Sequence, residues 1–189
     1  LTRLRQLCLE PRLVYDNIDQ PSSKLKACME LIKTMQENKQ KVLLFSSFTS
    51  ALDLIAEECQ KAGITYYMLT GSTNKEERRE LVSRFQKDNT TLFLISLKAG
   101  GTGLNLTSAE NVIHYDPWWN VSAQNQATDR AYRIGQKSNV QVFNLVMKDS
   151  VEEKIIEMQK RKKELADMFV ENNSGGLSQM SKEDILSLF

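Results

Sequence analysis

The sequence is poor in the residues that build metal sites and disulfide frameworks. Its 189 residues contain only three cysteines and one histidine. Cys8, Cys28 and Cys59 are widely spaced and form no Cys-x-x-Cys pair, which is typical of reduced intracellular thiols and excludes a disulfide scaffold or a zinc cluster. The single His114 lies in an apolar run, so we expect a structural role for it and no metal site on this chain.

Long hydrophobic runs and an excess of one charge are also missing. No apolar run approaches the ~20 residues of a membrane helix, so we expect no membrane segment. The formal net charge is +1, and any nucleic-acid binding must therefore come from locally placed donors rather than from a basic surface. The first residue is Leu1 and not methionine, which leads us to expect a fragment of a longer protein.

Apolar runs alternate with helical patterns along most of the chain. A parallel strand buried on both faces reads as a continuous apolar run, and capping residues at Ser22, Ser50 and Thr73 predict a helix after each of three connectors. Gly63 suits the position just past a helix end. The repeat of strand, turn and helix predicts an α/β doubly wound parallel sheet with helices on both faces. The predicted strands are 41–46, 65–69, 91–96, 111–116 and 140–147.

Four segments follow from these patterns. Residues 1–21 are predicted to be a lead-in helix and a connector, and residues 22–148 the sheet domain. Ser150 and Glu153 form a capping pair for a long helix over residues 149–170. The composition of residues 171–189 predicts a flexible linker followed by a short terminal helix.

A polar stripe marks the segment after the fourth strand. If residues 123–134 are helical, Gln126, Asp129, Arg130 and Arg133 repeat at i, i+3, i+4 and i+7 and share one side. Two guanidinium groups then lie one turn apart and point at a common target. The alternative is an ordinary ion pair of Asp129 with Arg133 on a solvated face.

Three ordered motifs carry a resemblance to a known family. Residues 126–136 resemble the last helicase motif of Swi/Snf-type superfamily-two ATPases, residues 96–107 resemble the glycine-rich motif before it, and 116–120 (Asp-Pro-Trp-Trp-Asn) resemble its aromatic signature. The match runs with gaps from about Leu4 to the C-terminus. Tyr132 and Val121 depart from the pattern of many relatives, which bears on the subfamily and not on the class.

The resemblance implies a RecA-like C-terminal helicase lobe with a long brace helix, working with ATP and Mg²⁺ on double-stranded DNA. It implies arginine fingers at Arg130 and Arg133, whose rigid forks suit a transferring phosphoryl group. Gln126 and Asp129 would position them, and Gly101, Gly103, Asn105 and Gln126 would border the nucleotide. The residues expected to face DNA are Ser47, Gly71, Ser72, Lys98, Thr107 and Trp118. For Ser47 and Ser72 simple helix capping stays open, as does burial of both tryptophans.

What the sequence omits completes the hypothesis. It contains no Gly-x-x-x-x-Gly-Lys-Ser/Thr loop and no Asp-Glu-x-His motif, so the phosphate cradle and the Mg²⁺ ligands are expected on an N-terminal RecA-like lobe. This chain would then be half an active site, inactive as an ATPase alone, in the cytoplasm or nucleoid of a bacterium or the nucleus of a eukaryote. The rival is a non-catalytic DNA- or protein-binding module, and an RNA helicase of the same superfamily is a weaker third option.

Overall fold

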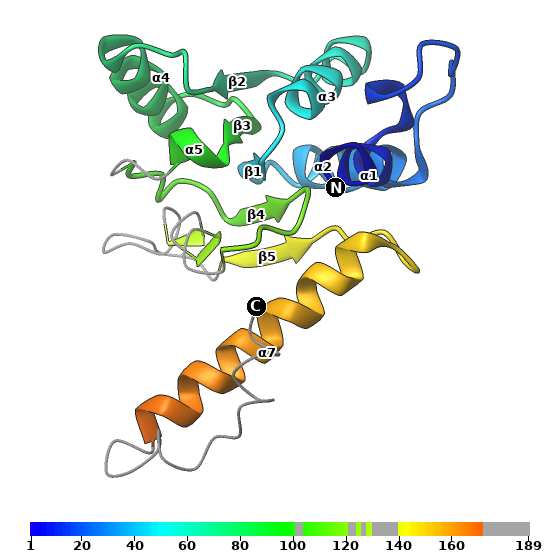
Figure 1. The fold of residues 1–189 in the computed structure, drawn as a ribbon. Coiled ribbons are helices and arrows are strands. Elements are labelled where there is room, and N and C mark those ends of the chain that lie inside the picture. Colours follow the sequence, from blue (N-terminus) through cyan, green and yellow to red (C-terminus); the bar gives the residue numbers. More distant parts are fainter. Residues whose placement is uncertain (101–103, 121–123, 126–127, 130–139, 172–189) are drawn as a thin grey trace.

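A single parallel sheet forms the centre of the molecule. The computed structural model describes residues 1–100, 104–120, 124–125, 128–129 and 140–171. Within them the strand order is β2-β3-β1-β4-β5, and every neighbouring pair is parallel. Figure 1 shows the sheet with helices on either side, which confirms the predicted architecture. The strands are β1 (Val42–Ser46), β2 (Tyr66–Leu69), β3 (Leu92–Ser96), β4 (Asn111–His114) and β5 (Gln141–Asn144).

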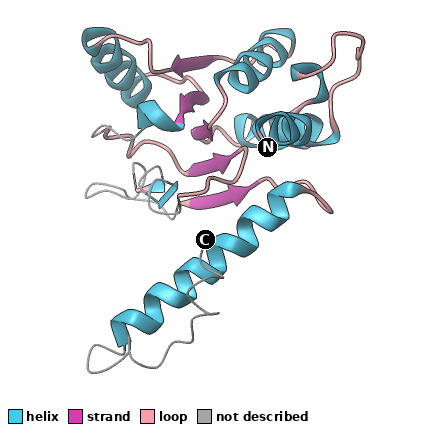
Figure 2. Ribbon diagram, in the orientation of Figure 1, coloured by secondary structure: helices cyan, strands magenta, loops and turns pink. Residues whose placement is uncertain are grey.

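Helices connect the strands and flank the sheet (Figure 2). All but the shortest lie close to the positions that the apolar periodicity predicts. The exception is a single turn, α5, in the stretch after β3 that the sequence marks only by its glycines. The helices are α1 (Thr2–Leu9), α2 (Ser23–Glu37), α3 (Thr49–Lys61), α4 (Lys75–Lys87), α5 (Leu97–Gly100) and α7 (Val151–Glu171), with a 3₁₀ turn, η1 (Pro11–Leu13).

Two hydrophobic layers hold the helices on the sheet. Successive side chains of a strand point to opposite faces, so Leu44 of β1 packs with α2 and α3 whereas Phe45 packs with α4 and α5. Both side chains are fully buried. The short continuous apolar runs of the sequence are therefore strands covered on both faces, as the prediction required.

The helix ends test the predicted caps. Ser22 caps α2 as expected, because its Oγ accepts a hydrogen bond from Leu25 N at 3.1 Å. The caps predicted at Ser50 and Thr73 are wrong. Helix α3 begins at Thr49 after Phe48, which makes no side-chain cap bond. Thr73 Oγ1 accepts from Thr70 N at 3.1 Å inside the turn, and Asn74 caps α4 in its place.

The signals predicted at the end of α3 and at the start of α7 are confirmed. Gly63 follows α3 with a φ of +68°, the left-handed conformation that a glycine after a helix adopts at little cost. At the start of α7, Ser150 Oγ accepts from Glu152 N at 3.1 Å and Glu153 Oε2 accepts from Asp149 N at 2.9 Å. Figure 1 shows α7 extending past the β5 edge of the sheet.

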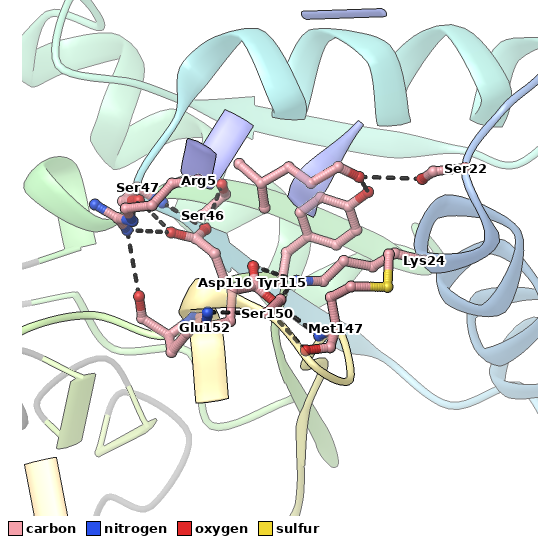
Figure 3. A network of polar contacts seen from close by, with 12 residues as sticks. Arg5, Ser22, Lys24, Ser46, Ser47, Tyr115, Asp116, Met147, Ser150 and Glu152 are labelled. Carbon is pink, nitrogen blue, oxygen red and sulfur yellow. Dashed lines mark hydrogen bonds and ion pairs between the residues drawn. The ribbon is translucent and has the colours of Figure 1, made fainter. Parts of the chain in front are cut away.

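A buried ion pair fastens α7 to the rest of the fold. Lys24 Nζ of α2 lies 2.7 Å from both carboxylate oxygens of Glu152, and both side chains are almost completely buried. Glu152 Oε2 also accepts from Met147 N at 2.8 Å, and the Lys24 ammonium lies 5.3 Å from the centre of the Tyr115 ring. The long C-terminal helix is therefore anchored at its first turn (Figure 3).

Candidate functional site

Five of the predicted site residues that the structure describes, Ser47, Gly71, Ser72, Lys98 and Trp118, lie at one edge of the sheet. Because the strands are parallel, their carboxyl ends meet at this edge, where open α/β sheets bind ligands. Ser47 follows β1, Gly71 and Ser72 follow β2, Lys98 and Asn105 follow β3, and Trp118 follows β4. Thr107 lies between β3 and β4, in the same stretch as Asn105. The segment after β4 carries the rest of the polar stripe.

Asp116 fixes the ends of β1 and β4 to each other. Its carboxylate is 2% exposed. It accepts hydrogen bonds from Ser46 Oγ at 2.7 Å and from Ser47 N at 3.0 Å, and a further one from Ser47 Oγ. Ser47 thus lies at the predicted edge, but its hydroxyl proton is directed inward to a carboxylate (Figure 3).

Arg5 of α1 enters the same network from 111 residues away in sequence. Its Nη2 donates to Asp116 Oδ2 at 3.0 Å, to Ser47 Oγ at 2.9 Å and to the Pro117 carbonyl at 3.2 Å. The guanidinium also lies 4.9 Å from the Phe48 ring centre, within the range of a cation–π contact. Sequence reasoning missed this residue, since only the fold brings α1 to the edge.

The turn after β2 is open to solvent. Gly71 and Ser72 are exposed, and a Cβ placed on Gly71 would meet no atom within 4 Å. Ser72 Oγ lies 2.8 Å from Thr70 Oγ1, so the hydroxyl group stays within the turn and does not cap α4. The simple capping role left open for Ser72 is therefore wrong.

The stretch after β3 is tied to α4. Lys98 is exposed on α5 and Thr107 is half-buried. The side chain of Gln86 bridges the backbone there, donating to the Asn105 carbonyl at 2.8 Å and accepting from Ser108 N at 2.9 Å. This bridge fixes the backbone of Asn105, whose side chain is exposed, beside the last turn of α4. Gly101 and Gly103 lie outside the described residues.

The aromatic signature is partly buried. Trp118 and Trp119 are both half-exposed, and Trp118 packs against the core layer of α4 and α5. The Trp118 carbonyl accepts a hydrogen bond from Gln159 Nε2 of α7. Complete burial of both tryptophans is therefore wrong, and this loop also joins α7 to the edge.

His114 connects β4 to the start of the polar stripe. Its ring is 1% exposed, stacks on Phe45 with ring centres 5.7 Å apart, and places Nε2 2.9 Å from Thr128 Oγ1. Burial lowers the pKa of His114 to about 4, so the ring is neutral at pH 7, in line with the structural role that the sequence predicts. Gln124 Nε2 donates to Asn144 Oδ1 at 3.0 Å and ties the same segment to β5. Gln126, Arg130 and Arg133 lie outside the described residues.

The thiols behave as core groups where they are buried. Burial raises the pKa of the Cys59 thiol to about 12, and it raises the pKa of Cys28 further. Across the described ranges, no three His, Cys, Asp or Glu side chains are grouped so that they could hold a metal ion. No helix in that part of the chain combines the length and apolarity of a membrane span.

A comparison with family models decides the class of the fold. The model described as helicase conserved C-terminal domain matches residues 23–135. The chain belongs to this family. The match begins at α2 and ends just after the polar stripe, so it covers four of the five strands, β1 to β4, and the segments that follow them.

Individual relatives place the chain among Swi/Snf-type helicases. It is 37% identical over 190 residues to an uncharacterized ATP-dependent helicase of Mycoplasma pneumoniae, covering 100% of this chain and 18% of that protein. It is 38% identical over 196 residues to the putative ATP-dependent helicase/translocase YwqA of Bacillus subtilis, covering 100% and 21%. The chain therefore spans about a fifth of the length of these relatives.

A solved structure agrees with the sequence matches. The SWI2/SNF2 ATPase core domain of Sulfolobus solfataricus aligns with a TM-score of 0.73 at 32% identity, covering 100% of this chain and 39% of that one. The RecA-like fold and the C-terminal helicase lobe of a Swi/Snf-type ATPase, both implied by the three sequence motifs, are confirmed.

Proposed function

We propose that this chain is the second motor lobe of an ATP-dependent double-stranded DNA translocase. The observation that carries the proposal is the similarity along the whole chain to a SWI2/SNF2 ATPase core. In this proposal residues 22–148 form the lobe, residues 1–21 lead in from an N-terminal RecA-like lobe, and α7 braces the lobe through the Lys24–Glu152 pair. The protein would act inside the cell, in the cytoplasm or nucleoid of a bacterium or the nucleus of a eukaryote.

ATP would bind between the two lobes. The N-terminal lobe would supply the phosphate-binding loop and the Mg²⁺ ligands, since this sequence contains neither of the corresponding motifs. Gly101, Gly103, Asn105 and Gln126 would border the nucleotide from this side. Asn105 suits the role because its side chain is exposed while Gln86 holds its backbone.

The chemistry proposed for this lobe is stabilisation of charge. Transfer of the γ-phosphoryl group to water spreads negative charge over three equatorial oxygens, and a positioned arginine is worth about 10³–10⁵ in rate. Arg133 is proposed as the principal finger and Arg130 as its partner. The hydrogen bond of His114 with Thr128, two residues before Arg130, would orient the segment that carries them.

DNA would lie along the carboxyl edge of the sheet. Gly71, Ser72 and Lys98 are exposed there, and a phosphate can approach Gly71 closely because no atom crowds it. Thr107 and Trp118 would complete the path. A serine hydroxyl can donate one hydrogen bond, and Ser47 Oγ donates its hydrogen bond to Asp116. This bond would have to break before Ser47 could donate to a phosphate.

Removing the principal finger in the whole polypeptide tests the proposal. Arg133→Ala should lower DNA-stimulated ATP hydrolysis by about 10³-fold or more while ATP affinity stays nearly unchanged, because the arginine acts mainly in the transition state. The measurement is steady-state ATPase activity together with fluorescent-nucleotide titration. Arg161→Ala, on the exposed surface of α7, is the control and should keep full activity. Retained turnover in Arg133→Ala would remove the finger assignment.

A further inference from the structure

A basic groove runs beside the site, and its cationic side chains have no role in the function proposed above. It is a hollow of about 700 Å³ between α4, from its first residue to Ser83, and the stretch after β3. Three of the side chains that line it are cationic and none is acidic. The lining residues are Thr73, Lys75, Arg78, Arg79, Val82, Ser83, Leu104 and Asn105.

The charges of α4 are sorted between its sides. Lys75, Arg78 and Arg79 repeat at i, i+3 and i+4 and share the groove side, whereas Glu76, Glu77 and Glu80 do not line it. The whole chain carries 25 basic and 24 acidic residues. Three cations without an acid are therefore a local excess that the overall composition does not explain.

Two of these cations are available to a ligand. Arg78 is half-buried and donates to the Ala99 carbonyl at 3.4 Å, so it also ties α4 to α5. Lys75 and Arg79 are exposed, and neither has an ion-pair or hydrogen-bond partner within the described part of the chain. Arg84 on the same helix does have partners: its Nη1 lies 3.7 Å from Glu80 Oε1, and its guanidinium lies over the Tyr67 ring.

The form of the groove fits a chain of phosphates. From Lys75 to Ser83 the helix rises about 12 Å at ~1.5 Å per residue, while the phosphates of one DNA strand follow each other at ~3.4 Å along the duplex axis. Thr73 opens the groove next to Ser72, so a strand held at the turn would continue into it. Val82 and Leu104 give an apolar floor for the sugar carbons.

We propose that this groove is a second DNA-backbone subsite, in which Lys75 and Arg79 bind phosphates of the strand held by Gly71 and Ser72. The inference rests on the proposed function, because it extends the same DNA path. Such contacts would add affinity and salt dependence without sequence preference.

The salt dependence of DNA binding tests the subsite. The whole polypeptide is titrated with a labelled 30-base-pair duplex by fluorescence anisotropy at several salt concentrations between about 50 and 200 mM. The slope of log K against log salt is negative, and each lost phosphate contact reduces its magnitude by about 0.9 on B-DNA. The double variant Lys75→Gln/Arg79→Gln is therefore expected to reduce the magnitude of this slope by about 1 to 2. Its thermal midpoint should match that of the wild type.

A matched double variant separates the groove from a general loss of charge. Arg84→Gln/Lys87→Gln removes two positive charges from the same helix outside the groove, and it should leave the slope unchanged. An equal reduction of the slope's magnitude in both double variants, or no reduction in Lys75→Gln/Arg79→Gln, overturns the subsite. The same result follows if ATP affinity falls in the groove variant while the DNA slope stays, because the phosphates bound there would belong to a nucleotide. If the wild-type polypeptide does not bind duplex DNA, the proposed function itself fails.

Discussion

His114 is a titratable group in a place where it cannot easily be charged. The ring is buried at the end of β4, and no partner of its Nδ1 occurs in the part of the chain that the structure describes. Burial lowers its pKa to about 4 from an ordinary value of 6.5. The unfolded chain therefore binds a proton below pH 6.5 that the folded chain accepts only near pH 4.

This difference predicts a fall in stability on acidification. The contribution of His114 to the free energy of unfolding is constant above about pH 6.5 and decreases as the pH falls from 6.5 towards 4. The loss from this residue is about 2 kcal/mol between pH 7 and pH 5. Urea unfolding at the two pH values measures it, and His114→Gln should lose that part of the difference. Because His114 is the only histidine, its Cε1 proton resonance can be followed directly. A midpoint near 6.5 in the folded protein would contradict the prediction.

Individual residues show where sequence reasoning reaches and where it stops. Ser22 and Gly63 depend on neighbours within a few positions, and both were predictable. Asn74 replaced Thr73 as the cap because Thr73 is already used inside its own turn, a competition that a capping pattern does not contain. Arg5 and Asp116 are brought together across 111 positions, and no local signal marks that pair.

Among the elements, α7 is anchored to the domain by a buried ion pair. Its first turn is held by Glu152, which pairs with Lys24 of α2. Burial lowers the pKa of Lys24, opposed by the charge of Glu152. If the carboxylate is removed, the ammonium must either stay buried without a partner or lose its proton.

Breaking this pair should therefore detach α7 at a high cost. Glu152→Ala is expected to lower the free energy of unfolding by about 3–5 kcal/mol, and Lys24→Met/Glu152→Leu should recover most of it, because two apolar side chains leave no unpaired charge. Urea unfolding measures the loss, and limited proteolysis reports the release of the helix. The exposed pair of Glu157 and Arg161 supplies the control, since Glu157→Ala should cost less than about 1 kcal/mol. A small effect of Glu152→Ala would mean that α7 is held by other contacts.

Elements with strong periodicity were predictable, and short or edge elements were less so. The apolar run Val42–Ser46 could only be a buried strand. The predicted strand 140–147 is reduced to Gln141–Asn144, mostly exposed, because an edge strand pairs on one side only. Helix α5 is a single turn, too short to leave a period in the sequence. Its place was concealed by the glycine-rich motif around it.

For the whole molecule, the proposal makes catalysis a property of two lobes. This chain alone should hydrolyse no ATP, and neither should the N-terminal lobe alone, but a mixture of the two should do so when duplex DNA is added. The measurement is phosphate release, with this chain carrying Arg133→Ala as the control in the mixture. If the mixture binds DNA but never hydrolyses ATP, the chain is a binding module. Stronger stimulation by RNA than by duplex DNA would instead indicate an RNA helicase.

The sequence indicated the family, and the fold supplied the geometry at the carboxyl ends of the strands. The motifs at residues 96–107, 116–120 and 126–136 were sufficient to indicate the family, because three ordered motifs in register rarely occur by chance. They gave no sign that the Asp116 carboxylate is saturated by Ser46, Ser47 and Arg5. Hydrogen-bond partners depend on which elements meet, and that is decided by packing of the whole domain.

The attachment of α1 has a mechanical consequence. Arg5 donates to the Asp116 carboxylate, which also accepts hydrogen bonds from the end of β1. Helix α1 is therefore fixed directly to the ends of β1 and β4. A force applied to α1 would therefore reach the carboxyl ends of β1 and β4, where the proposal places the ligands. In the proposed two-lobed motor, this helix of eight residues would transmit force between the lobes.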